Sequence, residues 1–131
     1  MIQTKRVYEP AAQSDGQRFL VERLWPHGIK KAALSLTGWC KEAAPNHELR
    51  IWFNHDPAKG PEFQRRYRAE LDHKPETWWP LLAAAGRGNL TQLFSARDAE
   101  HNSAVVLKTY LEERLKTGDT GKAGRSFRRI V

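Results

Sequence analysis

Three segments of the chain have the apolar patterns of β-strands, namely residues 3–9, 18–25 and 90–95. In the second segment both faces of the predicted strand are mainly apolar, yet each face also carries charged residues. That pattern is typical of a central strand with charged groups near its ends. Few residues separate the first two strands, whereas a parallel crossover is usually longer. The relative direction of these two strands therefore stays open.

Apolar residues recur at helical spacing in most of the remaining chain. The clearest helix is predicted over residues 61–73, where Pro61 stands at the first position and Phe63, Tyr67 and Leu71 share one face. Further helices are predicted over residues 36–44, 46–53, 76–85 (with Pro80 as a kink or a first-turn residue) and 101–115. Strands interleaved with helices predict an α/β fold, a single compact domain with a small, mostly parallel sheet flanked by helices.

The charge of the chain is concentrated at its C-terminal end. The 131 residues carry a net charge of +7, and residues 116–131 hold more than half of that excess between several glycines. We therefore divide the chain into an α/β domain, residues 1–115, and a basic C-terminal extension, residues 116–131. Such an extension is either a solvated tail or an arm that binds nucleic acid.

Composition excludes or disfavours several classes of protein. No apolar run reaches the roughly 18 residues needed to cross a bilayer. The segment after Met1 lacks the apolar core of a secretory leader, so we expect a cytoplasmic protein. Cys40 is the only cysteine, which excludes an internal disulfide and favours a buried, unreactive thiol.

The common sequence signatures of cofactor-dependent and metal-dependent enzymes are not found in this chain. It has no Walker motif, no G-x-G-x-x-G and no G-x-S-x-G, and its five histidines lack the H-x-x-x-H and H-x-H spacings. We therefore predict no cofactor and no metal site. Whether the protein is an enzyme stays open.

Charged residues in and beside the first two strands are the first indication of a site. Arg6, Asp15, Arg18, Glu22 and Arg23 are expected to lie close together. A buried charge is costly unless it is paired, so these residues could simply neutralise one another. Alternatively, one or two arginines are left to hold an anion, for which the planar guanidinium is well suited.

The second indication is the set of residues that follow the strands, because ligands of open α/β sheets bind beyond the carboxyl ends of the strands. The predicted ligand-binding residues are Arg6, Arg18, Arg23, Trp25, Ser95, Arg97 and Asn102. The helix predicted after residue 98 would add the free N–H groups of its first turn. If the protein is an enzyme, Asp15 or Glu22 is the expected general base and His27 its acid–base partner.

Several sequence blocks together resemble a known family. They are KRVYEP (5–10), SDG (14–16), RFLVERLWPHG (18–28), WCKEAAP (39–45), LR (49–50), residues 63–71, LFSARD (93–98) and NSAVVL (102–107). Over about residues 3–115 this pattern resembles the YeaO-like branch of the bacterial family called domain of unknown function 488. The resemblance implies a compact cytoplasmic α/β domain with no established activity.

The chain departs from that family pattern at two places. Other branches of the family carry a Cys-His-Arg motif after the last strand, where this chain has His101, Asn102 and Ser103, so thiol chemistry does not transfer. This branch usually has arginine where the chain has His27, which removes one permanent cation.

Our leading hypothesis is a domain that binds a phosphate-bearing or nucleotide-like anion at the carboxyl ends of its strands. One alternative is a nucleic-acid-binding module that uses the basic extension, the patch Arg65, Arg66 and Arg68, and exposed tryptophans. Another is an interaction domain or homo-oligomer in which the arginines are purely structural.

Overall fold

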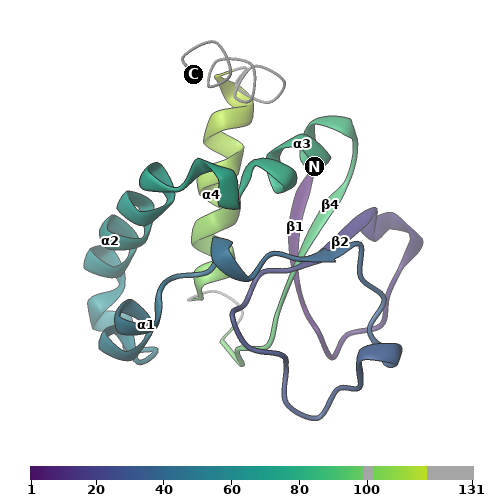
Figure 1. Cartoon of the computed structure of the whole chain (residues 1–131), viewed down its shortest axis with the longest axis horizontal. Coiled ribbons are helices and arrows are strands. Elements are labelled where there is room, and N and C mark those ends of the chain that lie inside the picture. The colour runs from purple at the N-terminus through teal and green to yellow at the C-terminus, as the bar shows by residue number, and fades with distance from the viewer. Residues whose placement is uncertain (99–101, 118–131) are drawn as a thin grey trace.

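The computed structural model describes residues 1–98 and 102–117, which form one sheet with helices packed against it (Figure 1). The strands are β1 (Ile2–Arg6), β2 (Gln17–Leu20), β3 (Gly38–Trp39) and β4 (Leu90–Phe94), and their order in the sheet is β1-β4-β2-β3. Each neighbouring pair is parallel, which confirms the predicted α/β class. β1 and β2 run in the same direction and flank β4 instead of pairing with each other.

The helices are α1 (His47–Phe53), α2 (Gly60–His73), α3 (Trp79–Arg87) and α4 (Ser103–Lys116). α1 and α2 confirm the predicted helices over residues 46–53 and 61–73. α3 begins later than predicted, after a short 3₁₀ turn, and Pro80 lies in its first turn, where a missing N–H group costs little.

The last helix only partly overlaps the residues that the structure describes. Its predicted start at His101 lies outside the described residues, and α4 continues through the proposed 115/116 boundary to Lys116. The predicted basic extension beyond residue 117 also lies outside the described part of the chain. Among the helices within residues 1–98 and 102–117, none combines the length and apolar character needed to cross a bilayer.

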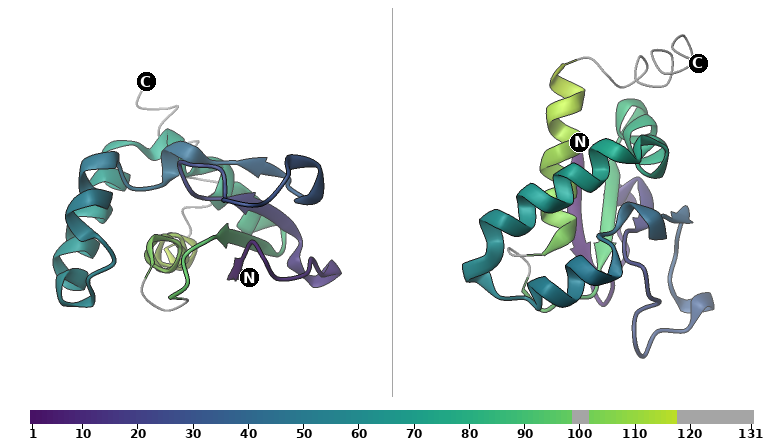
Figure 2. Two further views of the ribbon diagram at one scale, coloured as in Figure 1. Left: turned by 90° about the horizontal axis from the view of Figure 1, so that it is seen from below. Right: turned by 60° about the vertical axis from the view of Figure 1, so that its left-hand side comes forward.

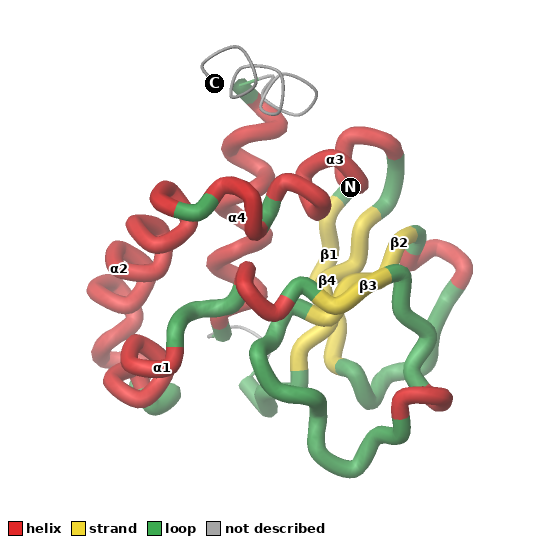
Figure 3. Tube along the Cα trace, in the orientation of Figure 1, coloured by secondary structure: helices red, strands yellow, loops and turns green. Residues whose placement is uncertain are grey.

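The two faces of the sheet are covered differently. Helices pack on one face, where the core includes Phe94 of β4 and Leu107 of α4. On the other face a smaller core joins Leu20 and Leu93 to Leu34, which belongs to the long loop between β2 and β3. Figures 2 and 3 show the helices on one side of the sheet and the long loops on the other.

The prediction of a helix over residues 36–44 is wrong, because β3 and a short 3₁₀ turn occupy this segment. The backbone N–H groups of Thr37 and Cys40 donate to carbonyl oxygens of β2 at 2.7 and 2.8 Å. Gly38 lies so close to the ring of Phe19 that a Cβ atom there would come within 3.0 Å of it. The open edge of β2 thus takes a partner from a segment whose own pattern favours a helix.

Both strands predicted in the first part of the chain are shorter than expected. β1 ends at Arg6, where the Glu9 carboxylate accepts the Arg6 N–H at 2.6 Å and the chain turns. β2 ends at Leu20, although Val21 still donates its N–H to β4 at 3.2 Å. The chain then leaves the sheet, so residues 22–27 lie beyond its carboxyl edge.

Candidate ligand-binding cavity

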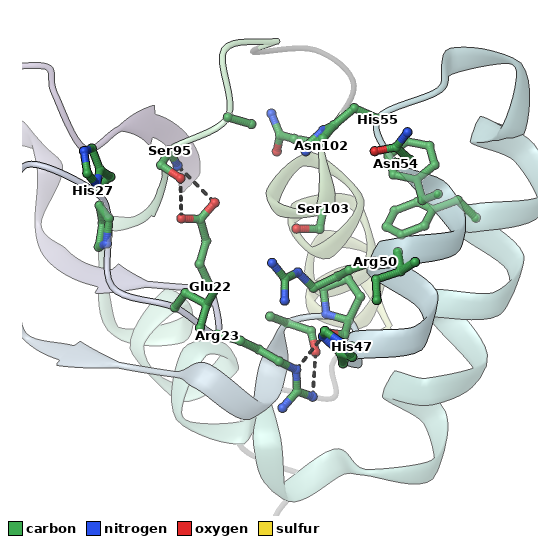
Figure 4. Close-up of a pocket in the computed structure, with 18 of the residues that line it drawn as sticks. Glu22, Arg23, His27, His47, Arg50, Asn54, His55, Ser95, Asn102 and Ser103 are labelled. Atoms are coloured by element: carbon green, nitrogen blue, oxygen red, sulfur yellow. Dashed lines mark hydrogen bonds between the residues drawn. The ribbon is translucent and has the colours of Figure 1, made fainter.

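A cavity of about 610 Å³ lies beyond the carboxyl ends of β2 and β4 (Figure 4). Its walls are the loops after these two strands, α1 with its flanking residues, and the first turn of α4. The sequence-predicted site residues that line it are Glu22, Arg23, Trp25, His27, Ser95 and Asn102. A volume of this size is typical of sites for small molecules.

The Glu22 carboxylate is fixed in the cavity wall by Ser95. Its Oε1 accepts the Ser95 hydroxyl at 2.8 Å, and its Oε2 accepts the Ser95 backbone N–H at 3.0 Å. Glu22 follows β2 and Ser95 follows β4, so two neighbouring strands bring this pair together. A carboxylate bound in this way cannot rotate freely and presents its remaining lone pairs in a fixed direction.

Arg23 lies in the same wall, but most of its hydrogen-bonding capacity is used within the protein. Its Nε donates to the Pro45 carbonyl at 2.7 Å and its Nη2 to the Ala44 carbonyl at 3.1 Å. Its Nη1 pairs with the exposed Glu42 carboxylate at 3.2 Å. Arg23 therefore joins the loop after β2 to the segment before α1, and it contributes charge to the cavity more than free donors.

α1 supplies cationic and titratable side chains that our sequence analysis did not select. Arg50 and His47 line the cavity from this helix, and Figure 4 shows the Arg50 side chain reaching into the cavity. The Arg50 side chain is exposed to solvent at the cavity, and within residues 1–98 and 102–117 no carboxylate or carbonyl pairs with its guanidinium. For Arg50 the sequence held one signal, its position in the block LR (49–50) that resembles the family pattern. The sequence of a single helix does not show which strand ends that helix packs beside.

The end of α1 carries the backbone outliers of the described chain. Asn54 and His55 line the cavity and have φ angles of 45° and 54°, in the left-handed region that non-glycine residues rarely adopt. Such conformations persist where surrounding structure enforces them, and they concentrate at functional sites. They turn the chain at the end of α1 and place the His55 side chain beside the cavity.

The first turn of α4 closes the cavity on another side. The Asn102 side chain caps this helix by accepting the Val105 N–H at 3.1 Å, and it donates to the Asp98 carbonyl at 2.8 Å. Asn102 is 5% exposed, and these two bonds use half of the hydrogen-bonding capacity of its amide while they fix the start of α4. Next to it, the Ser103 hydroxyl lines the cavity and has no hydrogen-bond partner in the part of the chain that the structure describes.

Two further predicted residues, Trp25 and His27, lie on the opposite side, in the loop after β2. The Trp25 indole N–H donates to the Ile29 carbonyl at 2.6 Å, which fixes this ring. The His27 carbonyl accepts the Tyr8 hydroxyl at 3.1 Å, which fixes the backbone here, and the exposed His27 side chain lies at the cavity rim.

Asp15 and Arg18 do not line this cavity. They form a buried ion pair on the loop-covered face of the sheet, and Lys5 adds a second contact to Asp15 at 3.0 Å. Burial alone raises the pKa of Asp15, but the Ala12 N–H together with Lys5 and Arg18 outweighs it and holds that pKa below its usual value.

The remaining predicted residues, Arg6 and Arg97, also lie outside the cavity wall. Arg6 donates to the carbonyls of Ser95 and Ala96 at 3.1 and 3.0 Å, so it supports the loop that carries Ser95. Arg97 is exposed. The charged residues that we expected in one network thus divide into separate contacts around Asp15, Glu22 and the strand-exit loops.

The polar groups of the cavity offer charge and hydrogen bonds, and no metal cluster or reactive thiol is found beside them among the described residues. Among residues 1–98 and 102–117, no group of three or more histidine, cysteine or acidic side chains is placed to hold a metal ion. Cys40 is half-buried outside the cavity, and burial raises the pKa of its thiol to about 11. Such a thiol is a poor nucleophile at neutral pH.

Comparison with known proteins places this chain in a family. A family model described as the inactive DUF488-N3 subclade matches residues 1–128. The chain belongs to this family. The match extends beyond the resemblance of residues 3–115 and includes most of the basic extension.

Relatives from Escherichia coli and Mycobacterium tuberculosis align with this chain over nearly their whole length. The uncharacterized protein YeaO of Escherichia coli K12 is 46% identical over 110 residues, which cover 84% of this chain and 96% of YeaO. The uncharacterized protein Rv3073c of Mycobacterium tuberculosis H37Rv is 40% identical over 113 residues, covering 86% and 95%. No solved structure gives a significant match.

Proposed function

We propose that this protein binds an anionic, phosphate-bearing small molecule in the cavity at the carboxyl edge of its sheet. The observation that carries this proposal is Arg50, a guanidinium that reaches into the cavity and has no protein counter-charge among the described residues. A guanidinium binds phosphate through two parallel N–H···O bonds, so an anion would complete its hydrogen bonding.

The surroundings of Arg50 support the same ligand class. Two arginines and one glutamate are the lining residues with full charges at pH 7, and three of the five histidines of the chain also line the cavity. The Ser103 hydroxyl and the N-terminal end of α4 add hydrogen-bond donors and a favourable helix dipole. The cavity therefore has an excess of positive charge and of donors.

We favour binding over catalysis. Glu22 and His27 both line the cavity and could in principle exchange protons with a ligand, whereas Asp15, the other predicted base, is buried elsewhere. The matching family model is described as an inactive subclade, which is consistent with a domain that retains a ligand site without a reaction.

The nucleic-acid alternative has less support among the described residues. Arg65 and Arg66 on α2 both pair with Glu62, and Arg68 pairs with Glu113 of α4. These ion pairs reduce the charge that the helical patch could offer to a phosphate backbone. The other component of that hypothesis, the basic segment after residue 117, lies outside the described residues.

Titration calorimetry with inorganic phosphate and ribose 5-phosphate tests the proposal on the full chain. Arg50→Gln should weaken binding by roughly 10- to 100-fold, because it removes a charge-assisted bidentate contact. Arg87→Gln is the matched control: it removes the same charge from the exposed end of α3, outside the cavity, and should change the affinity less than about twofold. Equal effects of the two variants, or no binding by the wild type, would contradict the proposed function.

A further inference from the structure

The Glu22 carboxylate is a second group in the cavity that can bind a ligand. It is negatively charged and accepts hydrogen bonds, whereas Arg50 is positively charged and donates them. Ser95 occupies one acceptor position on each of its two oxygens. An ionised carboxylate offers about four acceptor positions, so about one per oxygen remains. Figure 4 shows Glu22 and Arg50 on different walls of the cavity. A ligand that fills the space between them meets cationic donors at one end and a carboxylate acceptor at the other.

The charges around Glu22 decide which donor it would accept. Arg23 and Arg50 line the same cavity, so a ligand group with its own positive charge would be repelled there. Neutral hydroxyl groups donate hydrogen bonds without adding charge. Two hydroxyls on adjacent carbon atoms match the two oxygens of one carboxylate, each of which has an acceptor position left.

We infer that the ligand is a phosphorylated ribosyl compound, a sugar phosphate or a nucleotide, whose vicinal hydroxyl groups donate to Glu22 while Arg50 holds its phosphate. This inference rests on the proposed function and adds the identity of the uncharged part of the ligand, the sugar. Glu22 is then a specificity-determining residue, and Ser95 is the positioning residue that holds its carboxylate in place.

The size and rim of the cavity fit a ligand larger than phosphate. The volume of about 610 Å³ leaves space for a sugar and a further group beside an anion. Leu24 and Ile51 line the cavity and are nevertheless 65% and 64% exposed. Large apolar side chains exposed at the rim of the cavity offer a surface on which the flat face of a base could pack.

The inference is tested by comparing ligands that differ in one hydroxyl group. The probes are inorganic phosphate, ribose 5-phosphate with 2-deoxyribose 5-phosphate, and AMP with 2′-deoxy-AMP, each titrated into the full-length protein at one salt concentration. In at least one pair the ribo form should bind about tenfold or more tightly than its deoxy partner, because a hydrogen bond to a charged group is lost. The pair that discriminates also tells a free sugar phosphate from a nucleotide.

Glu22→Gln should strongly reduce this discrimination, since it removes the negative charge that strengthens the hydrogen bonds from the hydroxyls and leaves one acceptor oxygen in place of two. Glu42→Gln is the matched control, because it removes an equal charge from a carboxylate that pairs with Arg23 but does not line the cavity. Thermal unfolding of both variants checks that the fold is kept. If Glu22→Gln is unstable, Glu22→Asp takes its place; this variant keeps the carboxylate on a shorter side chain and should retain part of the discrimination between ribo and deoxy ligands.

The outcomes separate this inference from the proposed function. If phosphate and both members of each pair bind equally, in an Arg50-dependent way, the anion site stands and the assignment of Glu22 to hydroxyl groups is overturned. If discrimination exists but survives Glu22→Gln, the assignment is also overturned. If none of the probes binds, the proposed function fails and this inference falls with it.

Discussion

Substitution of Asp15 by asparagine should destabilise the protein severely, although Asp15 lies outside the cavity. This carboxylate is only 1% exposed and accepts hydrogen bonds from Gln3, Lys5, Arg18 and the Ala12 N–H. Asparagine has nearly the same shape but no charge, and its amide hydrogens would face cationic donors. The change therefore isolates the charge of the residue.

The magnitude follows from the partners that would remain. The Lys5 side chain is 18% exposed and can turn towards water, but the Arg18 side chain is 7% exposed and would stay buried without its counter-charge. Removing one partner of a buried pair costs about 3–5 kcal/mol, and the freedom of Lys5 favours the lower value, about 3 kcal/mol. For a domain of this size the melting temperature should fall by roughly 10 °C.

The loss should depend on pH in a defined direction. The pKa of Asp15 is held below its usual value of 3.8 in the folded state, so its carboxylate stabilises the fold above about pH 4. As the pH falls from there through the folded-state pKa, the carboxylate becomes protonated in the folded protein as well, and the stabilisation is lost. The wild type and Asp15→Asn should therefore differ by a constant amount near neutral pH and converge in acid.

Urea unfolding followed by tryptophan fluorescence, repeated over a series of pH values, measures this difference. Glu42→Gln is the control, since this carboxylate is 66% exposed and its pair with Arg23 should contribute below about 1 kcal/mol. A variant at Asp15 as stable as the wild type at neutral pH would refute the reasoning, and so would a difference that grows in acid.

Two further predictions concern a glycine pair and the single thiol. Gly16→Ala should cost about 3 kcal/mol or more in urea unfolding, because Gly16 has φ +65° and a Cβ would lie 2.2 Å from the Asn89 carbonyl oxygen. Gly28 has φ +80°, but a Cβ there would meet no atom within 4 Å, so Gly28→Ala should cost only about 1 kcal/mol of stability. Equal losses of stability at the two glycines would contradict this account. Cys40, whose pKa is raised by burial to about 11, should react with a disulfide reagent at pH 8 roughly 100-fold more slowly than free cysteine. If Cys40 in the folded protein reacts as fast as free cysteine, and as fast as it does after unfolding, the thiol is not protected and this prediction is wrong.

The fold class was predictable because most elements carry their own signals. In α2 the residues at helical spacing, Phe63, Tyr67 and Leu71, are the ones that are buried, and α1 begins at a capping asparagine. β3 was not predictable, since its two residues are strand only because the edge of β2 binds their backbone. Local pattern carries no information about such a contact.

The candidate site was predictable in place but only partly in composition. Glu22 and Ser95 were predicted to lie together because strand exits of a parallel sheet meet at one edge, and both line the cavity. Of the predicted arginines, Arg6 and Arg18 lie outside this cavity: Arg18 pairs with a buried carboxylate, and Arg6 donates to backbone carbonyls. Arg50 was missed because it lies on a helix whose packing against that edge is decided by tertiary contacts.

The central claim, an anion bound at the carboxyl edge of the sheet, is tested most directly by mapping backbone amide shifts in a ¹⁵N NMR titration with ribose 5-phosphate. We predict saturable shifts at residues that line the cavity from separate elements, such as Arg50, Ser95 and Ser103, with little change on the exposed face of α2. Shifts centred on Arg65 and Arg66 of α2, or shifts that never saturate, would contradict the account.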